Sequence, residues 1–145
     1  MIVESASYEE TIAVGKQIAS RLNPGDIVAL EGGLGAGKTA LTAGIAAFFG
    51  FTEGIASPTF TIINPYETPT LTLYHVDVYR LERAEELLDI GLDDMLYDGG
   101  GITVIEWADK IKEFLPEDVI RIFISRDDKK GENYRKLTID WGRDR

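Results

Sequence analysis

The chain has 145 residues, and its 25 acidic against 15 basic residues give a formal net charge of −10, so its own surface is poorly suited to binding nucleic acid. It has no cysteine and a single histidine, His75, which excludes disulfides, thiolate metal sites and histidine-rich metal clusters. No apolar run approaches the roughly 20 residues that span a bilayer, and the first residues lack the features of a signal peptide. We therefore expect one cytoplasmic domain over residues 1–145.

The first predicted element is a helix that follows a capping signal. Residues 7–10 read Ser-Tyr-Glu-Glu, which matches the S-x-x-E capping box. Apolar residues then recur at helical spacing as far as residue 22. Asn-Pro-Gly at residues 23–25 ends this helix, and residues 26–30 (Asp-Ile-Val-Ala-Leu) are expected to form a short buried strand.

A phosphate-binding loop follows this strand. Residues 32–39 read Gly-Gly-Leu-Gly-Ala-Gly-Lys-Thr and match G-x-x-x-x-G-K-[ST], and residues 40–49 read as the helix behind the loop. In such a loop the backbone N–H groups converge on phosphate oxygens. We expect Lys38 to reach the β- and γ-phosphates and the Thr39 hydroxyl to ligate Mg²⁺.

The second half of the chain alternates further strands and short helices. The remaining strands are expected at residues 59–66, 70–79, 102–105, 119–125 and 135–140, and the remaining helices at residues 84–88, 92–96 and 107–114. The first two of these strands are too close in sequence for a parallel crossover and should pair antiparallel. The sequence thus predicts an α/β fold, a P-loop NTPase-like three-layer domain with a mixed, partly antiparallel central sheet.

Two acidic residues stand near the ends of predicted strands. Asp77 lies near the end of one strand and Glu106 directly after another. Carboxylates at these places project into the crevice where ligands bind in open α/β folds. Each alone is equally well read as an ordinary strand residue, but the pair in a chain with a phosphate loop favours a functional site.

The hydroxyls of Ser57 and Thr59 flank a proline between the loop helix and the next strand. Segments that sense a γ-phosphate lie in such a place, although from spacing alone a simple turn at Ser57-Pro58 is favoured. Trp107 follows Glu106 directly, and from the sequence it could equally be an ordinary core residue.

Three further blocks accompany the loop at residues 32–39. They are Ser-Pro-Thr-Phe at residues 57–60, His-Val-Asp-Val-Tyr-Arg-Leu at residues 75–81 and Glu-Trp-Ala-Asp at residues 106–109. In order and spacing the four blocks resemble the bacterial TsaE family, also called YjeE. The loop alone is shared by very many NTPases, whereas the combination is specific and covers nearly the whole chain.

The resemblance implies an ATP-binding and ATP-hydrolysing subunit in the synthesis of threonylcarbamoyladenosine, a modification beside the anticodon of tRNA. It implies the TsaD and TsaB proteins as partners, with TsaD performing the threonylcarbamoyl transfer and the ATPase supporting repeated cycles. Turnover by the protein alone is expected to be slow, because no arginine finger is obviously placed near the loop in the sequence and a partner would complete the site.

The family's site residues carry over by motif. The expected nucleotide-binding residues of the loop are Gly33, Leu34, Gly35, Ala36, Gly37, Lys38, Thr39 and Ala40. The expected metal ligands are Thr39, Asp77 and Glu106, and Glu106 would also orient the attacking water. With Lys38, the two carboxylates form the expected catalytic set.

Three more residues are assigned to the nucleotide site by the resemblance. Trp107 would support the site and Thr11 would border the adenosine, and Thr59 of the Ser-Pro-Thr-Phe block is counted with the nucleotide-binding residues. Two positions depart from many relatives, since Gly33 stands where they have Asp and Ala40 where they have a hydroxyl residue. One absent hydrogen bond is worth about 0.5–1.5 kcal/mol, so we expect weaker nucleotide affinity rather than loss of binding.

Two other functions use the same loop. A small-molecule kinase would transfer phosphate to a metabolite, but no arginine-rich lid is evident between the strands. A non-hydrolytic nucleotide-sensing module would bind ATP only to set the state of a partner. A GTPase is disfavoured because the chain has no N-K-x-D motif for reading guanine.

Overall fold

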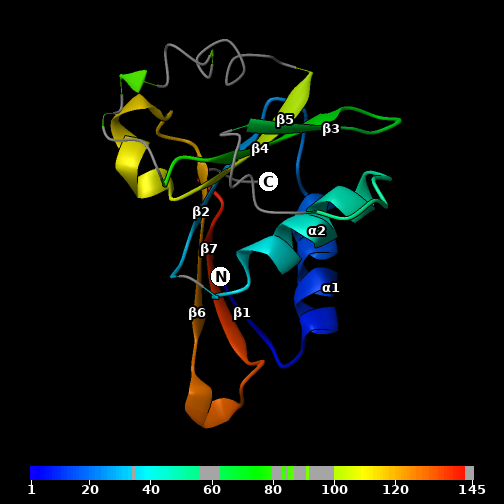
Figure 1. The fold of residues 1–145 in the computed structure, drawn as a ribbon, viewed down its shortest axis with the longest axis vertical. Helices are drawn as coiled ribbons and strands as arrows, with labels where there is room; N and C mark the ends of the chain where they lie inside the picture. Colours follow the sequence, from blue (N-terminus) through cyan, green and yellow to red (C-terminus); the bar gives the residue numbers. More distant parts are fainter. Residues whose placement is uncertain are drawn as a thin grey trace.

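The computed structural model describes residues 1–33, 35–55, 63–79, 83, 85–86, 91 and 100–142 (Figure 1). Its strands are β1 (Ile2–Ser5), β2 (Ile27–Glu31), β3 (Ile63–Glu67), β4 (Thr72–Asp77), β5 (Gly101–Glu106), β6 (Ile120–Arg126) and β7 (Arg135–Asp140). Its helices are α1 (Tyr8–Ala19), α2 (Lys38–Phe48) and the 3-10 helices η1 (Ala108–Phe114) and η2 (Asp128–Lys130). None of the helices in these residues is both long and apolar enough to cross a membrane.

The strands form one mixed sheet in the order β1-β7-β6-β2-β5-β4-β3. The central strand β2 pairs in parallel with β5 and β6, and β4 continues the parallel set on the far side of β5. The edges are antiparallel, because β3 pairs with β4 and the β6–β7 hairpin carries β1. Carboxyl ends of β2, β4, β5 and β6 therefore meet at one edge of the sheet, where open α/β folds bind ligands.

Helices cover the two faces of the sheet, which makes the three layers (Figure 1). Helices α1 and α2 pack on one face over the larger core cluster, and η1 lies on the other over a smaller cluster. The two long helices approach closely at Gly15 and Gly44, where a Cβ atom would lie 2.4 Å from the Leu41 carbonyl oxygen and 2.1 Å from that of Ile12. Any larger residue at these positions would force the helices apart.

The capping box at the start of α1 forms as the sequence predicts. The Ser7 side chain accepts a hydrogen bond from the Glu10 N–H at 3.1 Å, and the Glu10 carboxylate accepts one from the Ala6 N–H at 2.6 Å. The side chains therefore satisfy donors that the helix itself leaves unpaired.

Several predicted elements differ from the structure at their bounds. Strand β4 starts at Thr72 rather than residue 70 because the Thr68 hydroxyl and the Leu71 carbonyl close a turn at that point. The predicted helix at residues 107–114 is a 3-10 helix from Ala108, interrupted at Ile111. Strand β1 was not predicted, and the expected helices at residues 84–88 and 92–96 lie largely or wholly outside the described residues.

Candidate functional site

The phosphate loop joins the central strand β2 to helix α2. Gly35 and Gly37 have φ angles of 74° and 106°, in the left-handed region that favours glycine. Helix α2 starts at Lys38 with no side-chain cap and no acidic residue in its first turn. Its first N–H groups therefore remain available to an anion, and the helix dipole favours negative charge there.

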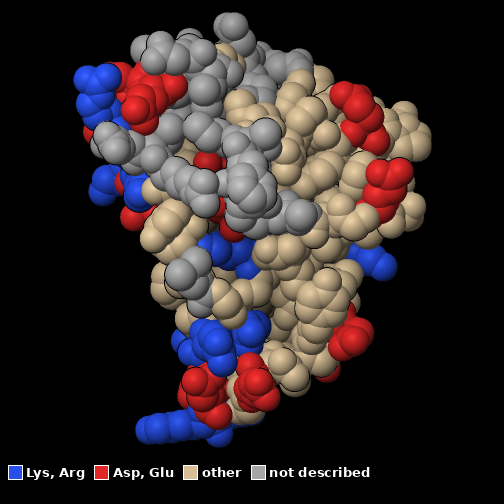
Figure 2. All heavy atoms as spheres, in the orientation of Figure 1, with Lys and Arg blue, Asp and Glu red and all other residues tan. Residues whose placement is uncertain are grey.

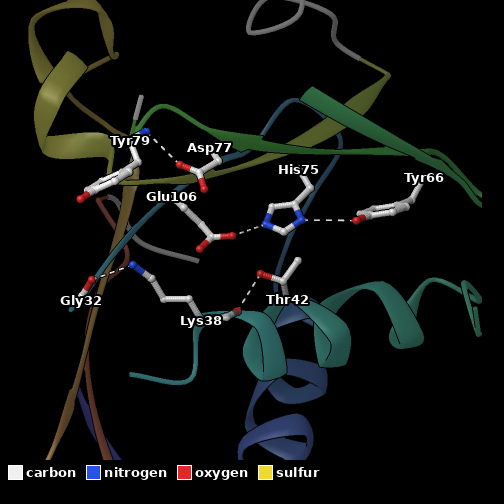
Figure 3. Close-up of polar contacts among 8 residues, drawn as sticks. All are labelled: Gly32, Lys38, Thr42, Tyr66, His75, Asp77, Tyr79 and Glu106. Carbon is white, nitrogen blue, oxygen red and sulfur yellow. Dashed lines mark hydrogen bonds and ion pairs between the residues drawn. The ribbon is translucent and has the colours of Figure 1, made fainter. Parts of the chain in front are cut away.

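The Lys38 ammonium group lies inside the site rather than in solvent (Figure 3). Its Nζ atom donates a hydrogen bond to the Gly32 carbonyl oxygen at 2.7 Å and sits 3.8 Å from the centre of the Trp107 ring. Burial lowers the pKa of Lys38, and the nearby carboxylates of Glu106, Asp77 and Asp109 oppose this shift. The loop thus presents its cation at the start of α2, where a triphosphate would need it.

Two carboxylates face the loop from adjacent strand ends. Asp77 ends β4, Glu106 ends β5, and the two residues are direct partners in the parallel register. The Asp77 carboxylate also accepts a hydrogen bond from the Tyr79 N–H at 2.8 Å, and Glu106 is buried, with 3 % of its surface exposed. This is the pair that the sequence predicts as partners for a hard cation.

The Glu106 carboxylate has a partner that sequence reasoning missed. His75 of β4 is fully buried, and its Nε2 atom makes a short contact with Oε2 of Glu106 (Figure 3). On the other side of the ring, Nδ1 lies 3.4 Å from the Tyr66 hydroxyl of β3. His75 belongs to the block at residues 75–81, and it meets Glu106 diagonally across the β4–β5 pairing, in which its own register partner is Val104.

Trp107 forms the wall of the site opposite the loop. Its φ angle of 63° is unusual for a bulky residue, and its N–H donates to the Leu30 carbonyl oxygen at 3.2 Å. Its ring packs on that of Tyr79 with 4.7 Å between centroids. A strained residue kept against the Lys38 ammonium indicates a constraint at the site itself, since a plain core residue has no need of this conformation.

Nucleotide binding should therefore change the fluorescence of Trp107. An ammonium group over an indole ring is held by cation–π attraction of about 2 kcal/mol or more when desolvated, and a bound triphosphate would draw Lys38 away from the ring. We expect a saturable change in tryptophan emission on titration with ATP and Mg²⁺. The Trp107→Phe variant, which keeps Trp141 as its tryptophan, should show no such change; an equal change in that variant would contradict the placement.

Two arginines lie beside the loop, although their spacing in the sequence does not indicate it. Arg126 and Arg135 are register partners at the loop end of the β6–β7 hairpin. The Arg135 guanidinium donates to the Gly35 carbonyl oxygen at 3.2 Å, and Arg126 pairs with Asp128 at 3.0 Å. Arginine side chains therefore do lie beside the loop, because β6 runs parallel to β2 and so ends at the same edge. The expectation that no arginine finger is placed there stays a prediction.

These arginines are engaged by the protein itself. The Arg135 side chain also donates to two carbonyl oxygens of its own hairpin, at 3.0 and 2.8 Å. Figure 2 shows basic and acidic side chains side by side at the tip of the hairpin rather than a continuous basic surface. The Arg135 side chain thus binds the backbone of the loop and does not point freely into the site.

The other predicted site residues are placed as follows. Thr39 is half-buried in the first turn of α2, and Ala36 and Ala40 are buried beside it. Gly33 is exposed, and a Cβ atom there would meet open space. Leu34 and Thr59 lie outside the described residues.

Thr11 is buried within the fold at the start of α1. It is 2 % exposed in the first turn of α1, its hydroxyl donates to the Ser7 carbonyl oxygen at 3.1 Å, and it is 2.7 Å from the Ser5 hydroxyl. These contacts tie the Thr11 side chain to the residues just before α1 and so stabilise the start of that helix. A direct contact between Thr11 and a nucleotide stays a prediction.

Comparisons with known proteins identify the family of this chain. The model of the family described as "Threonylcarbamoyl adenosine biosynthesis protein TsaE" matches residues 5–137. A Bacillus subtilis protein named tRNA threonylcarbamoyladenosine biosynthesis protein TsaE is 46% identical over 131 residues, which cover 90% of this chain and 79% of the relative. A Treponema pallidum protein of the same name is 42% identical over 118 residues, covering 81% of this chain and 86% of the relative.

A solved structure extends the likeness to three dimensions. The crystal structure of Bacillus subtilis YdiB has a TM-score of 0.78 to this chain at 38% identity, and the match covers 96% of this chain and 83% of that one. The predicted P-loop NTPase-like fold with a mixed sheet is confirmed by this match and by the strand order. From the family model and the identities above, the chain belongs to the TsaE family.

Proposed function

We propose that this protein is a Mg²⁺-dependent ATPase of tRNA threonylcarbamoyladenosine biosynthesis, acting in the cytoplasm. The observation that carries the proposal is the placement of the Lys38 ammonium between the Gly32 carbonyl oxygen and Trp107, with the carboxylates of Asp77 and Glu106 at neighbouring strand ends. The relatives' names supply the biosynthetic process. The arrangement of Lys38, Asp77 and Glu106 supports the proposal that the protein binds a nucleotide.

The nucleotide site assigns separate tasks to the loop and to the strand ends. The loop N–H groups and Lys38 would hold the triphosphate, and Thr39, Asp77 and Glu106 would hold Mg²⁺. Their oxygen donors fit a hard cation. When bound, Mg²⁺ neutralises charge on the β- and γ-phosphate oxygens.

Hydrolysis then requires an oriented water molecule. Glu106 would accept a hydrogen bond from that water, whose oxygen attacks the γ-phosphorus while the bond from that phosphorus to the β–γ bridging oxygen breaks. The products are ADP and inorganic phosphate, and the phosphate or the solvent takes up the water's proton. Because Arg135 is bound to carbonyl oxygens of the loop and of its own hairpin, and Arg126 to Asp128, a cation from a partner is expected to complete the site.

The partners proposed from the family resemblance are TsaD and TsaB, with the ATPase supporting repeated turnover of the transferase. The acidic surface, with a net charge of −10, favours contact with proteins over direct contact with tRNA. The test is the ATPase rate of the purified protein alone and with TsaB and TsaD. Stimulation by the pair supports the proposal; nucleotide binding with no stimulation would favour the sensing module or the kinase.

A further inference from the structure

The Glu106 carboxylate is held from behind by a buried imidazole. His75 has no exposed surface, and its Nε2 atom contacts Oε2 of Glu106 across the β4–β5 pairing. We propose that His75 is a positioning residue, which fixes the side-chain orientation of Glu106 for hydrolysis. The inference rests on the proposed ATPase function and adds a residue to its site.

The direction of the hydrogen bond follows from the chemistry of the partners. An ionised carboxylate can only accept, so Nε2 of His75 must carry the hydrogen and donate it to Glu106. The opposite ring nitrogen faces the Tyr66 hydroxyl at 3.4 Å, and the two rings lie 6.0 Å apart at 40°. Tyr66 is itself 8 % exposed, so side chains from β3, β4 and β5 form a buried row that ends at Glu106.

This row leaves one carboxylate oxygen for the reaction. Figure 3 shows Oε2 of Glu106 directed at His75, while the other oxygen turns toward the side where Lys38 and Gly32 lie. Without the imidazole, the Glu106 side chain could adopt other rotamers and would lose the alignment that an attacking water needs. Partners of this kind, which orient a metal ligand or a base, typically change activity by about 10–100-fold when removed.

Two amide substitutions separate positioning from folding. In His75→Gln the side chain is long enough to bring an N–H near the position of Nε2 and so to reach Glu106. In His75→Asn the amide is one bond shorter, stays near the position of Nδ1 beside Tyr66, and leaves Glu106 without this donor. Both variants bury a neutral amide at the same site, so their folding costs are closely matched.

We expect kcat for ATP hydrolysis to fall about 10–100-fold in His75→Asn, with KM for ATP changed by less than about threefold, and to recover most of that loss in His75→Gln. In a Glu106→Gln background, His75→Asn should cause no further loss, because the group it positions is already gone. Asp26→Asn is the control for a general loss of stability. It changes a buried carboxylate just before the first residue of β2, at the end of that strand away from the phosphate loop.

The outcomes separate this inference from the function on which it rests. If the wild-type rate exceeds that of Lys38→Ala but His75→Asn and His75→Gln have equal kcat, the positioning role is wrong while the ATPase stands. A parallel fall in kcat and thermal stability, matched by Asp26→Asn, also overturns it. If the wild-type protein hydrolyses no faster than Lys38→Ala, both proposals fail.

Discussion

Replacing Lys38 with alanine should reduce ATP hydrolysis to background. The ammonium is the cation of the loop, and a hydrogen bond to a charged group contributes about 1.5–3 kcal/mol, or roughly 10–100-fold in affinity. The same contact strengthens as charge builds on the transferring phosphate, so the loss in rate should exceed the loss in binding. Nucleotide affinity by titration and phosphate release under multiple turnover measure the two effects.

The Lys38→Ala variant should fold normally. Alanine is the best helix former, and the hydrogen bond from the Thr42 hydroxyl to the backbone carbonyl of residue 38, 2.9 Å long, does not depend on the side chain. Removal of a buried ammonium also removes a desolvation cost. Lys112→Ala, an exposed lysine of η1, is the matched control and should keep wild-type activity. Normal ATPase activity in Lys38→Ala would show that residues 32–39 do not form the nucleotide site.

The elements that frame this site were predictable from local sequence. The loop glycines, the buried strand before them and the helix after them are encoded within residues 26–49, so the pattern alone indicates them. The apolar run at residues 102–105 likewise predicts a buried strand, and it places Glu106 at the strand end. These inferences succeeded because each depends on neighbouring residues.

The features that the sequence did not reveal depend on pairing between distant segments. His75 meets Glu106 across 31 positions, and Arg135 meets Gly35 across 100. Both contacts follow from the strand order, which residue patterns alone leave open. Strand β1 is equally non-local, because four residues at the N-terminus are held by pairing with β7 near the other end of the chain.

The left-handed backbone conformation of Trp107 is also not predicted by the sequence pattern. Propensity predicts a helix from this residue, yet its φ of 63° turns the chain out of β5 and delays the helix to Ala108. The pairing of its N–H with the Leu30 carbonyl oxygen continues the β2–β5 contact by one residue. Tertiary pairing at the site therefore overrides the local preference.

Glu106→Gln should separate nucleotide binding from hydrolysis. Glutamine has nearly the shape of glutamate, and its amide oxygen can still accept the hydrogen bond from Nε2 of His75. What it removes is the negative charge that would hold Mg²⁺ and align the attacking water. We expect kcat to fall by about 10²–10⁴-fold, the range of a general acid–base group, while Lys38 and the loop still bind ATP. Glu113→Gln, an exposed residue of η1, is the control.

The same variant decides between an ATPase and a nucleotide-sensing module. If hydrolysis drives repeated cycles, Glu106→Gln should bind ATP and join TsaD and TsaB, yet fail to support multiple turnovers of the transferase. A sensing module needs only the bound state, so its partners would continue to turn over with the variant. Because binding and hydrolysis are measured on one nearly isosteric protein, sustained transferase turnover without ATP hydrolysis would refute the ATPase role while leaving the nucleotide site in place.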